Sequence, residues 1–596
     1  MQPVRLGSRA IRLAIVGLVA AVCCGTAIYA QGTGLDACKS KAQAQRPLDV
    51  YVPMDSWIYP ALDRLHSLGY LDTAFLGVRP WTRRSVERML EEIDEQEGMP
   101  ADSQAAEIAS AVRREVGLGD DAATSDRGEL FYSCEQLYTR MQGVSGQMLR
   151  DSFHLGQTIT NDYGRPYAPG FNTVNGAAGS AQFGRFSLYA RGEYQHSPGY
   201  TGYSPGLAAQ LASLDLVATP LPPPPNTPQP TIPAGPIAEA NSFRLVEANL
   251  SYRILNHEIS FGKSDHWLGP AMGGAFAYSN NAENIYAFQI DRTEPLYIPL
   301  LSKLVGPFRY DFFVGSLKGH SIPNDPWMHI EKINFKPTPN VEFGFERTVI
   351  WGGKGRACLQ SNGTFVTCNE PITLHTFLKS FFSVSNLTDT EKFSRNDPGA
   401  RFASFDFSWR LPWLQHWMML YADSMVHDDV SPADAPRHAS IRPGIYLARM
   451  PGLPKMDFRF EGANSNSDNG RSQLGSYLYV EREQPQGYTN KGNIMGDWIG
   501  RESQGGQAWL TYHLSPMEMV QASFRHAKAA NDFIQGGTTQ SSFDIHVVKR
   551  FHQVAEISAD VQHEWWKAPI YKTGRQGNTV ATFQLTVYPK SGPKQK

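Results

Sequence analysis

Hydrophobic and polar residues alternate along most of the chain after about residue 128. Between residues 403 and 411, for example, Phe405, Phe407 and Trp409 are separated from one another by single polar residues. The same period recurs further on, at residues 456–461, 555–562 and 581–587. Successive side chains of a β-strand point to opposite faces, so the pattern predicts strands with one apolar and one polar face. We therefore expect residues 128–590 to form one large antiparallel β-structure.

Two architectures share this alternation, because a two-sheet sandwich shows it as well as a closed barrel. Three observations favour the barrel. The chain begins with an export signal, aromatic residues such as Trp409, Trp413 and Trp565 stand at predicted strand ends, and the region is long enough for more than a dozen strands of about 10 residues. We predict an all-β fold, a large antiparallel transmembrane β-barrel.

The residues before this region follow a helical period. Between residues 50 and 118, apolar residues recur every three or four positions. We predict a first helix that Asp55 caps and that ends at Gly69, a second helix after Thr82, and a third over residues 103–116. These helices form a small N-terminal α-helical domain, which we place in residues 31–127.

The first 30 residues have the three parts of a secretory signal peptide. Arg5, Arg9 and Arg12 precede an apolar run over residues 13–24, and a small-residue cleavage site follows before Gln31. No later segment has 18 consecutive apolar residues, so we predict no transmembrane helix in the exported chain. At the other end, residues 591–596 form a polar tail.

The composition agrees with strands that face lipid on one side and water on the other. Charged residues make up 19% of the 596 residues, below the roughly 25% of typical soluble domains. The mean hydropathy is nonetheless −0.36, so uncharged polar residues supply the polarity. A formal net charge of −2 gives no electrostatic argument for nucleic acid as a partner.

Four cysteines remain after removal of the signal peptide: Cys38, Cys134, Cys358 and Cys368. In an oxidising compartment they most simply form two disulfides, and three pairings are formally possible. The short spacing favours Cys358 with Cys368 as a loop clasp, which leaves Cys38 with Cys134. None of the spacings is typical of zinc, and we predict no metal and no cofactor.

One predicted strand runs into a glycine-rich loop that carries aromatic and basic groups. Phe343, Phe345 and Trp351 share one strand face, and Lys354 and Arg356 follow between glycines. A stacking aromatic beside cationic donors suits a polar, acidic, ring-bearing ligand such as a polysaccharide. The alternative is a membrane-edge tryptophan followed by a solvated turn.

A long insertion separates two predicted strands between residues 197 and 242. It contains four consecutive prolines at residues 222–225 and further prolines after them. Such a run cannot join a β-ladder and favours polyproline II. Long loops of transmembrane barrels face the cell exterior, so we predict an external loop.

Four motifs, in this order along the chain, resemble the Wzi family of outer-membrane capsule assembly proteins. They are Trp267-Leu-Gly-Pro270 leading into Ser279-Asn-Asn-Ala282, residues 344–356, Asn396-Asp-Pro-Gly-Ala-Arg401, and residues 488–501 from Tyr488 to Arg501. The resemblance covers most of residues 48–590. It implies a barrel of about 18 strands with a helical periplasmic domain, which acts as a lectin for capsular polysaccharide without chemistry.

Within the two glycine-rich motifs, the side-chain chemistry indicates seven candidate polysaccharide-binding residues: Trp351, Lys354, Arg356, Tyr488, Lys491, Trp498 and Arg501. Aromatic faces stack on sugars, and cations pair with uronates. The alternative places the tryptophans in the aromatic girdle and the arginines on lumen carboxylates. We predict structural roles for Arg347, which lies within a strand, and for Trp267.

The helical segment has a separate resemblance to one S-layer homology repeat, carried by residues 53–62, Gly69, residues 79–83 and Met89-Leu90. Such modules attach to cell-wall polymer and usually occur in threes, whereas one copy is visible here, so we favour a domain that packs under the barrel over one that grips peptidoglycan by itself. Peptidoglycan and the capsule export machinery are further candidate partners, beside capsular or other extracellular polysaccharide and outer-membrane lipid.

We interpret the chain as an outer-membrane, lectin-like protein that binds polysaccharide and supports its assembly or attachment at the cell surface. The alternative is a porin or uptake channel with an S-layer-like anchor. We do not expect an enzyme, because no Gly-x-Ser-x-Gly elbow accompanies a suitable histidine and no His-Glu-x-x-His occurs.

Overall fold

The structure is a computed structural model. It describes residues 48–95, 103–116, 130–149, 151, 153–154, 162–215, 232–383, 387–394, 397–414, 417–428, 438–467, 475–481, 483–552 and 554–589. The predicted signal peptide, Cys38, the four consecutive prolines and the C-terminal tail lie outside these residues.

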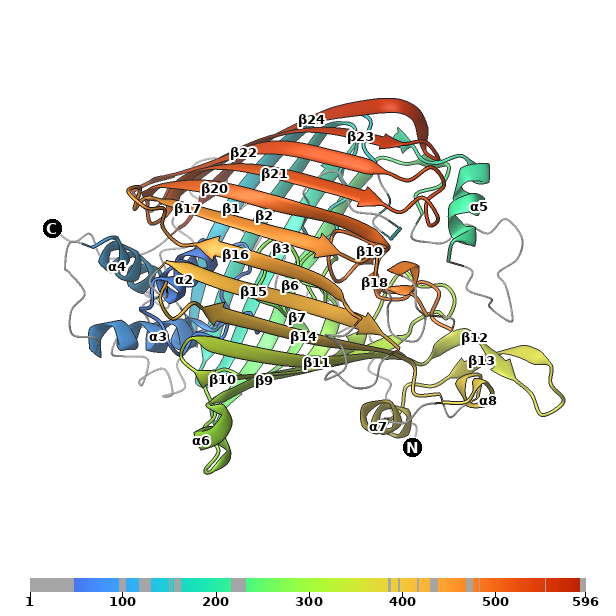
Figure 1. The fold of residues 1–596 in the computed structure, drawn as a ribbon, viewed down its shortest axis with the longest axis horizontal. Coiled ribbons are helices and arrows are strands. Elements are labelled where there is room, and N and C mark those ends of the chain that lie inside the picture. The colour runs from blue at the N-terminus through green and yellow to red at the C-terminus, as the bar shows by residue number, and fades with distance from the viewer. Residues whose placement is uncertain are drawn as a thin grey trace.

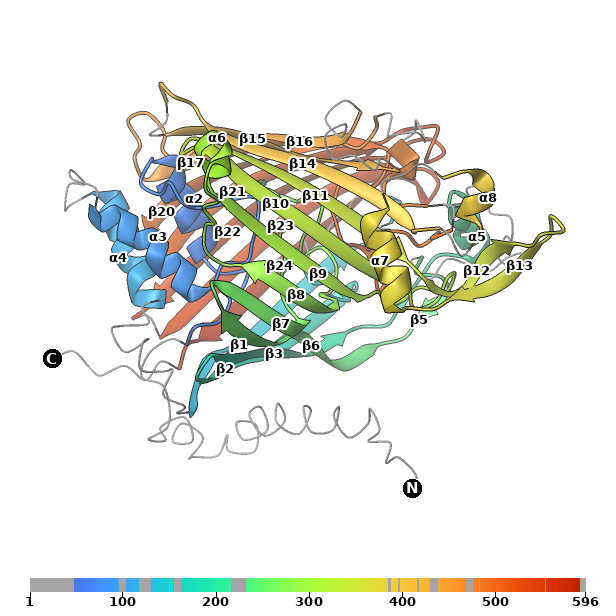
Figure 2. The same ribbon diagram turned by 90° about the horizontal axis from the view of Figure 1, so that it is seen from below.

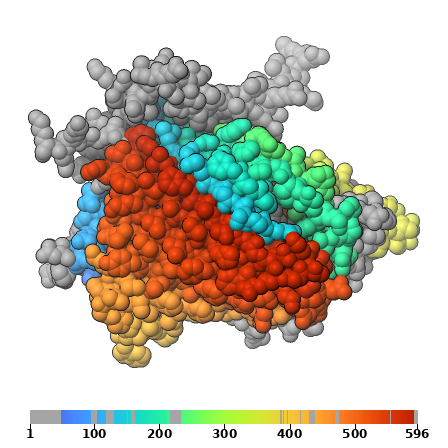
Figure 3. All heavy atoms as spheres, turned by 90° about the horizontal axis from the view of Figure 1, so that it is seen from above, coloured from blue at the N-terminus to red at the C-terminus, as the bar shows by residue number. Residues whose placement is uncertain are grey.

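Eighteen antiparallel strands form a closed barrel, as predicted (Figure 1). The sheet closes because β1 pairs with both β2 and β24, for example through Leu137 and Val587. Figure 3 shows this seam, where the red final strands lie directly beside the cyan first strands. The barrel strands are β1 (Leu130–Gly146), β2 (Gly170–Phe183), β3 (Phe186–Ser197), β6 (Ala240–Ile254), β7 (His257–Lys263), β8 (Tyr286–Arg292), β9 (Phe308–Ser316), β10 (Trp327–Thr338), β11 (Val341–Trp351), β14 (Ala400–Arg410), β15 (Met418–His427), β16 (Ser440–Leu447), β17 (Met456–Asn464), β20 (Ser503–Ser515), β21 (Glu518–Ala529), β22 (Thr539–Phe551), β23 (Ala555–Ala568) and β24 (Lys572–Val587).

The two ends of the barrel differ. At the short-turn end, most strands are joined by tight connections such as residues 255–256 and 516–517, and helices α2–α4 lie there (Figure 1). At the long-loop end, the five longest connections are residues 147–169, 198–239, 264–285, 352–399 and 465–502. Helix α6 (Leu301–Val305) lies in the connection between β8 and β9 at the short-turn end. The short elements in the long loops are β4 (Tyr200–Thr201), α5 (Pro205–Ser213), β5 (Pro236–Ile237), β12 (Gly353–Leu359), β13 (Phe365–Glu370), α7 (Leu374–Phe382), α8 (Asp389–Lys392), β18 (Thr489–Asn490) and β19 (Asn493–Ile494).

The wall has the two faces that the alternation predicts. On β11, Glu342, Glu346 and Thr348 are buried in the lumen, whereas Phe343 and Phe345 point outward and remain partly exposed. Outward apolar side chains recur around the barrel, and Leu250, Phe261 and Phe543 are 51%, 65% and 44% exposed. Such a belt is typical of transmembrane barrels. No helix among the described residues is long and apolar enough to cross a membrane.

The three predicted N-terminal helices are present as α2 (Ile58–Ser67), α3 (Arg83–Glu95) and α4 (Gln104–Val116). Their apolar faces form one core with lumen-facing residues of the wall, including Met419 and Tyr446. The domain therefore packs under and into the barrel. The predicted cap was wrong: α2 begins after Trp57 without a side-chain cap, and Asp55 instead accepts a hydrogen bond from Arg191 of β3 at 2.7 Å.

Residues 70–82, which connect helices α2 and α3, extend into the lumen of the barrel. The backbone N–H groups of Leu76 and Gly77 donate to the carboxylate of Glu342 at 2.8 and 3.0 Å. Arg309 donates to the carbonyl oxygens of Val78 and Pro80 at 3.0 and 2.9 Å. Wall side chains thus satisfy the backbone of a segment that has no regular structure, as burial requires.

The loops at the opposite end also fold inward. Apolar residues of loops 264–285 and 465–502 form a buried core with wall residues such as Phe313 and Phe402. The loop members include Phe276, Tyr278, Tyr479, Ile494 and Met495. The lumen is consequently occupied from both ends.

A buried ionic network fastens four loop segments at the long-loop end. The two ring nitrogens of His154 lie 2.7 Å from Asp151 and 3.1 Å from Asp215. Asp215 also accepts from Arg501 at 2.6 Å, and Asp151 accepts from the Tyr571 hydroxyl at 2.6 Å. Burial by itself would lower the pKa of His154, but the two carboxylates raise it to about 9.

The inserted segment of residues 70–82 has no room for a side chain at Gly77. A Cβ at Gly77 would overlap the side chains of Asn334 and Asp406 in the lumen. We expect Gly77→Ala to destabilise the docked N-terminal domain by about 1–3 kcal/mol, measured as faster protease cleavage within residues 48–116. Gly143→Ala on β1 is the matched control and should behave as wild type, because a Cβ added there would meet no other part of the protein within 4 Å.

The raised pKa of His154 makes the stability of the protein depend on pH. Because its folded-state pKa lies above the unfolded value of 6.5, its stabilisation is complete below about pH 6.5 and is lost as the pH rises through about 9. We expect the apparent melting temperature to fall over this interval, with a free-energy change on the order of 3 kcal/mol. His154→Asn should remove this pH dependence; an unchanged profile in the variant would contradict the assignment.

Candidate functional site

The first glycine-rich motif forms a hairpin that projects from the long-loop end (Figure 2). Strands β12 and β13 pair with each other, and the predicted disulfide between Cys358 and Cys368 joins them. The pairing of Cys134 with Cys38 stays a prediction, because Cys38 lies outside the described residues. The disulfide clasp links the two strands of this hairpin, which we call the hairpin arm.

Arg356 lies at the base of this hairpin and does not face solvent. Its side chain is buried among three carboxylates, with ion pairs to Glu370, Glu483 and, at 2.8 Å, Asp397. Burial alone would lower the Arg356 pKa, but the carboxylates raise it above its ordinary value. The predicted contact of Arg356 with polysaccharide is therefore wrong for this structure, since the guanidinium already has its anionic partners.

Trp351 was predicted to stack on a sugar, and the structure corrects this. Its side chain is 1% exposed because helix α7 crosses the outer face of β9–β11 and covers it (Figure 2). The Trp351 ring lies 5.9 Å from that of Phe377 on α7. Arg347, for which we predicted a structural role, donates to the backbone carbonyls of Phe381 and Ser383 at the end of α7, at 2.6 and 2.5 Å.

The aromatic and arginine residues of the second motif are also buried. Tyr488 stacks on Tyr479 and donates to the Ala277 carbonyl at 2.5 Å. Trp498 is 8% exposed and lies beneath two guanidinium groups, those of Arg442 and Arg525. Arg501 belongs to the His154 network. These side chains fasten the loops inside the lumen, so their predicted sugar contacts are corrected to structural contacts.

Trp267, the other residue with a predicted structural role, holds the interior together. It is 7% exposed, its indole N–H donates to the Ala271 carbonyl at 2.9 Å, and its backbone forms a β-bridge with Arg79. The bridge links loop 264–285 to the inserted N-terminal segment.

The two remaining candidates, Lys354 and Lys491, lie at the surface, and both contact loop 317–326. Loop 317–326 connects them: the Asn324 and Lys354 backbones form a bridge, and the Lys491 backbone N–H donates to the Lys318 carbonyl at 2.7 Å. The side chains of Lys318, Lys354 and Lys491 are 47%, 69% and 50% exposed. We call these three residues the lysine patch.

The lysine patch carries excess positive charge. Asp325 lies 3.2 Å from Lys318 and 3.7 Å from Lys354, so one carboxylate serves two ammonium groups. Lys491 lies 2.8 Å from Glu283, which Arg244 also contacts at 2.7 Å. Ammonium groups that share carboxylates keep capacity for further anions, and their exposure leaves them accessible to a polymer.

Sequence reasoning missed Lys318. A possible signal was the adjacent Gly319, whose φ of 81° marks a tight turn in loop 317–326. A Cβ at Gly319 would meet the Lys491 backbone at 2.8 Å, so glycine permits the two loops to touch. The partner loop is distant in sequence, however, and no local pattern identifies it.

Comparison with known proteins agrees with this architecture. A family profile described as "Capsule assembly protein Wzi" matches residues 139–581. An uncharacterized 55.8 kDa protein in the cps region of Klebsiella pneumoniae is 24% identical over 196 residues, 33% of this chain and 35% of that relative. The chain thus matches about a third of that relative's length.

A solved structure extends the likeness to the whole fold. The Escherichia coli protein Wzi, titled an outer membrane protein involved in group 1 capsule assembly and a carbohydrate-binding β-barrel, superimposes with a TM-score of 0.61. The match has 15% sequence identity and covers 90% of this chain and 99% of that one. With the profile match across most of the barrel, the chain belongs to the Wzi family of capsule assembly proteins.

Proposed function

We propose that this protein is a lectin-like barrel that binds acidic capsular or other extracellular polysaccharide and supports its assembly or attachment at the cell surface. The observation that carries the proposal is the lysine patch, three exposed ammonium groups on contacting loops at the long-loop end. The E. coli protein of the same family, described as carbohydrate-binding, supports it.

The chemistry of the patch suits a polymer with repeated carboxylates. Each exposed ammonium group contributes a weak, salt-sensitive contact, and several contacts on one chain reinforce one another. Binding of this kind requires no reaction, and the protein acts without catalysis. Among the described residues, no group of three or more His, Cys, Asp or Glu side chains is placed to hold a metal ion.

The proposal includes an orientation. The signal peptide in residues 1–30 exports the chain, and the apolar belt contacts the lipid of the outer membrane. Short turns face the periplasm and long loops face outward in such barrels. The helical domain is then periplasmic, and the lysine patch faces the exterior.

The helical domain acts mainly as a plug. In the segment that resembles an S-layer homology repeat, Trp81 is fully buried and Arg79 pairs with Asp63 at 2.7 Å, so these residues serve the domain's own packing. Contact with peptidoglycan or with the capsule export machinery, two further proposed partners, would use the outer surfaces of α3 and α4.

The filled lumen counts against the alternative of a porin. Loops 264–285 and 465–502 and the inserted residues 70–82 occupy it from both ends. We expect the purified protein to give no steady porin-like conductance in planar lipid bilayers. Stable open-channel currents from the intact protein would contradict the lectin proposal.

The lysine patch is tested by the triple variant K318Q/K354Q/K491Q. We expect its affinity for acidic capsular polysaccharide to fall about tenfold, with the difference shrinking at high salt, because three exposed charge contacts are lost. Binding is measured on the purified protein, and shed polysaccharide is assayed in cells.

Lys549 provides the matched control. It is 51% exposed at the short-turn end and paired with Glu518 at 2.9 Å, so K549Q removes a surface lysine of similar exposure away from the patch. Its polysaccharide affinity should equal that of wild type. Equal weakening by both variants, or none by the triple variant, would overturn the assignment of the patch.

A further inference from the structure

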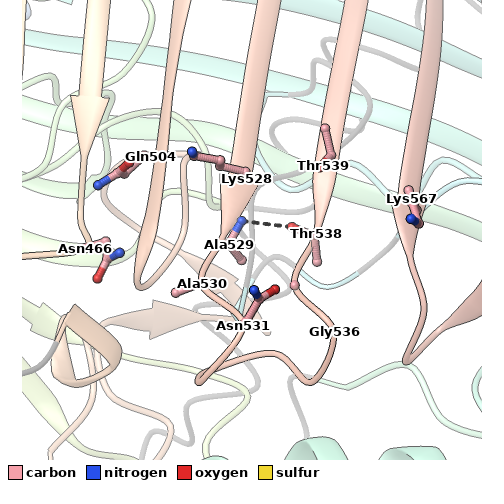
Figure 4. Close-up of a pocket in the computed structure, with 11 residues that line it drawn as sticks. Asn466, Gln504, Lys528, Ala529, Ala530, Asn531, Gly536, Thr538, Thr539 and Lys567 are labelled. Carbon is pink, nitrogen blue, oxygen red and sulfur yellow. Dashed lines mark hydrogen bonds between the residues drawn. The ribbon is translucent and has the colours of Figure 1, made fainter.

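A polar cavity opens on the outer wall at the long-loop end of strands β20–β23 (Figure 4). Its volume is about 340 Å³. Amide, hydroxyl and ammonium side chains line it, among them Asn466, Gln504, Lys528, Asn531, Thr539 and Lys567. The cavity shares no residue with the lysine patch.

Strand register sets four of these side chains in one row. Gln504 pairs with Lys528, and Thr539 pairs with Lys567. Ala527 pairs with Gln540, which puts Lys528 beside Thr539 on the neighbouring strand. The row therefore crosses four adjacent strands at one height on the barrel (Figure 4).

The row belongs to the lipid-facing surface. Because strand side chains alternate, Lys528 shares a face with Phe524, Thr539 with Phe543, and Lys567 with Val561. These apolar residues are 45%, 44% and 52% exposed. The two lysines thus stand on the outer wall in line with the apolar belt, and they do not face the lumen.

The height of the row corresponds to the headgroup layer. Lys528 follows Phe524 by four residues, about 10 Å along the axis of a tilted strand. In the intervening layer lies Trp565, an aromatic typical of membrane interfaces, with the Arg575 guanidinium 5.4 Å from its ring centroid. Toward the long-loop end, the outer wall therefore presents first the apolar belt, then the interfacial Trp565, and then the row with the two lysines.

The charges that line the cavity favour an anion. No carboxylate lines it, and within the described residues neither Lys528 nor Lys567 has an ion-pair partner. By contrast, Lys318 and Lys549 each pair with an aspartate or glutamate. The rim is already fixed, because the Ala529 N–H donates to the Thr538 hydroxyl at 3.0 Å (Figure 4).

We propose that this cavity binds the phosphorylated sugar headgroup of an outer-leaflet glycolipid. The two lysines pair with phosphate, and the amide and hydroxyl groups of the rim bind sugar hydroxyls. The position beside the apolar belt favours a lipid over a free polymer, because the acyl chains would lie against Phe524 and Phe543. The proposal goes beyond polysaccharide attachment and depends only on the membrane orientation proposed above.

The test uses the full exported chain in detergent, with bisphosphorylated lipid A and its dephosphorylated form as probes. We expect wild type to bind the phosphorylated lipid at least about tenfold more tightly, and K528Q/K567Q to lose this preference. K528R/K567R keeps both charges and should retain it, which separates loss of charge from misfolding. Native mass spectrometry of bound lipid gives the readout.

Two further measurements distinguish the glycolipid from free phosphate and from capsular polysaccharide. Inorganic phosphate should compete only weakly; competition as strong as that of the lipid would show a simple anion site and overturn the headgroup assignment. K528Q/K567Q should bind capsular polysaccharide as wild type does, and a loss equal to that of K318Q/K354Q/K491Q would make the cavity part of the polysaccharide site and overturn the proposal. Failure of polysaccharide binding in wild type would leave the lipid comparison unaffected.

Discussion

Closure of the sheet is the constraint on which the rest of this structure depends. Pairing of β1 with β24 leaves the barrel without an open edge, but an 18-stranded barrel encloses more space than its own side chains can fill. This chain fills the space with its N-terminal helices and its longest loops. Polar groups buried in the process must be paired, as Arg442 is by Asp497 at 2.5 Å and by Glu461 at 3.2 Å.

This constraint determines which residues remain for recognition. A guanidinium offers five donors in a planar fork, so it can satisfy several buried oxygens at once. Arg356 and Arg501 both do so in the interior. Lysine has a flexible stem and a compact charge, and the lysines of the same two motifs stay at the surface. The motifs are thus divided between anchoring the loops and presenting charge.

Period and spacing were sufficient to predict the barrel, the two faces of β11, the three helices and the Cys358–Cys368 clasp, because each depends on residues close together in sequence. They could not predict the burial of Trp351 beneath α7, the hydrogen bond from Arg191 to Asp55, or the backbone hydrogen bond between Lys491 and Lys318. These contacts join segments far apart in the chain, and the residues involved have no periodic signature. An exposed and a buried tryptophan look identical in a strand pattern.

Helix α7 adds exposed apolar surface to one side of the outer wall. Its apolar residues Leu374 and Phe382 point away from the protein and are 72% and 69% exposed, beside the outer faces of β9–β11. On the far side of the barrel, the row of Lys528 and Lys567 ends the apolar surface of β20–β23. Apolar surface therefore reaches farther toward the long-loop end on one side than on the other. In a bilayer of uniform thickness, such a barrel would tilt, and the hairpin arm would lean over the membrane on the side of α7.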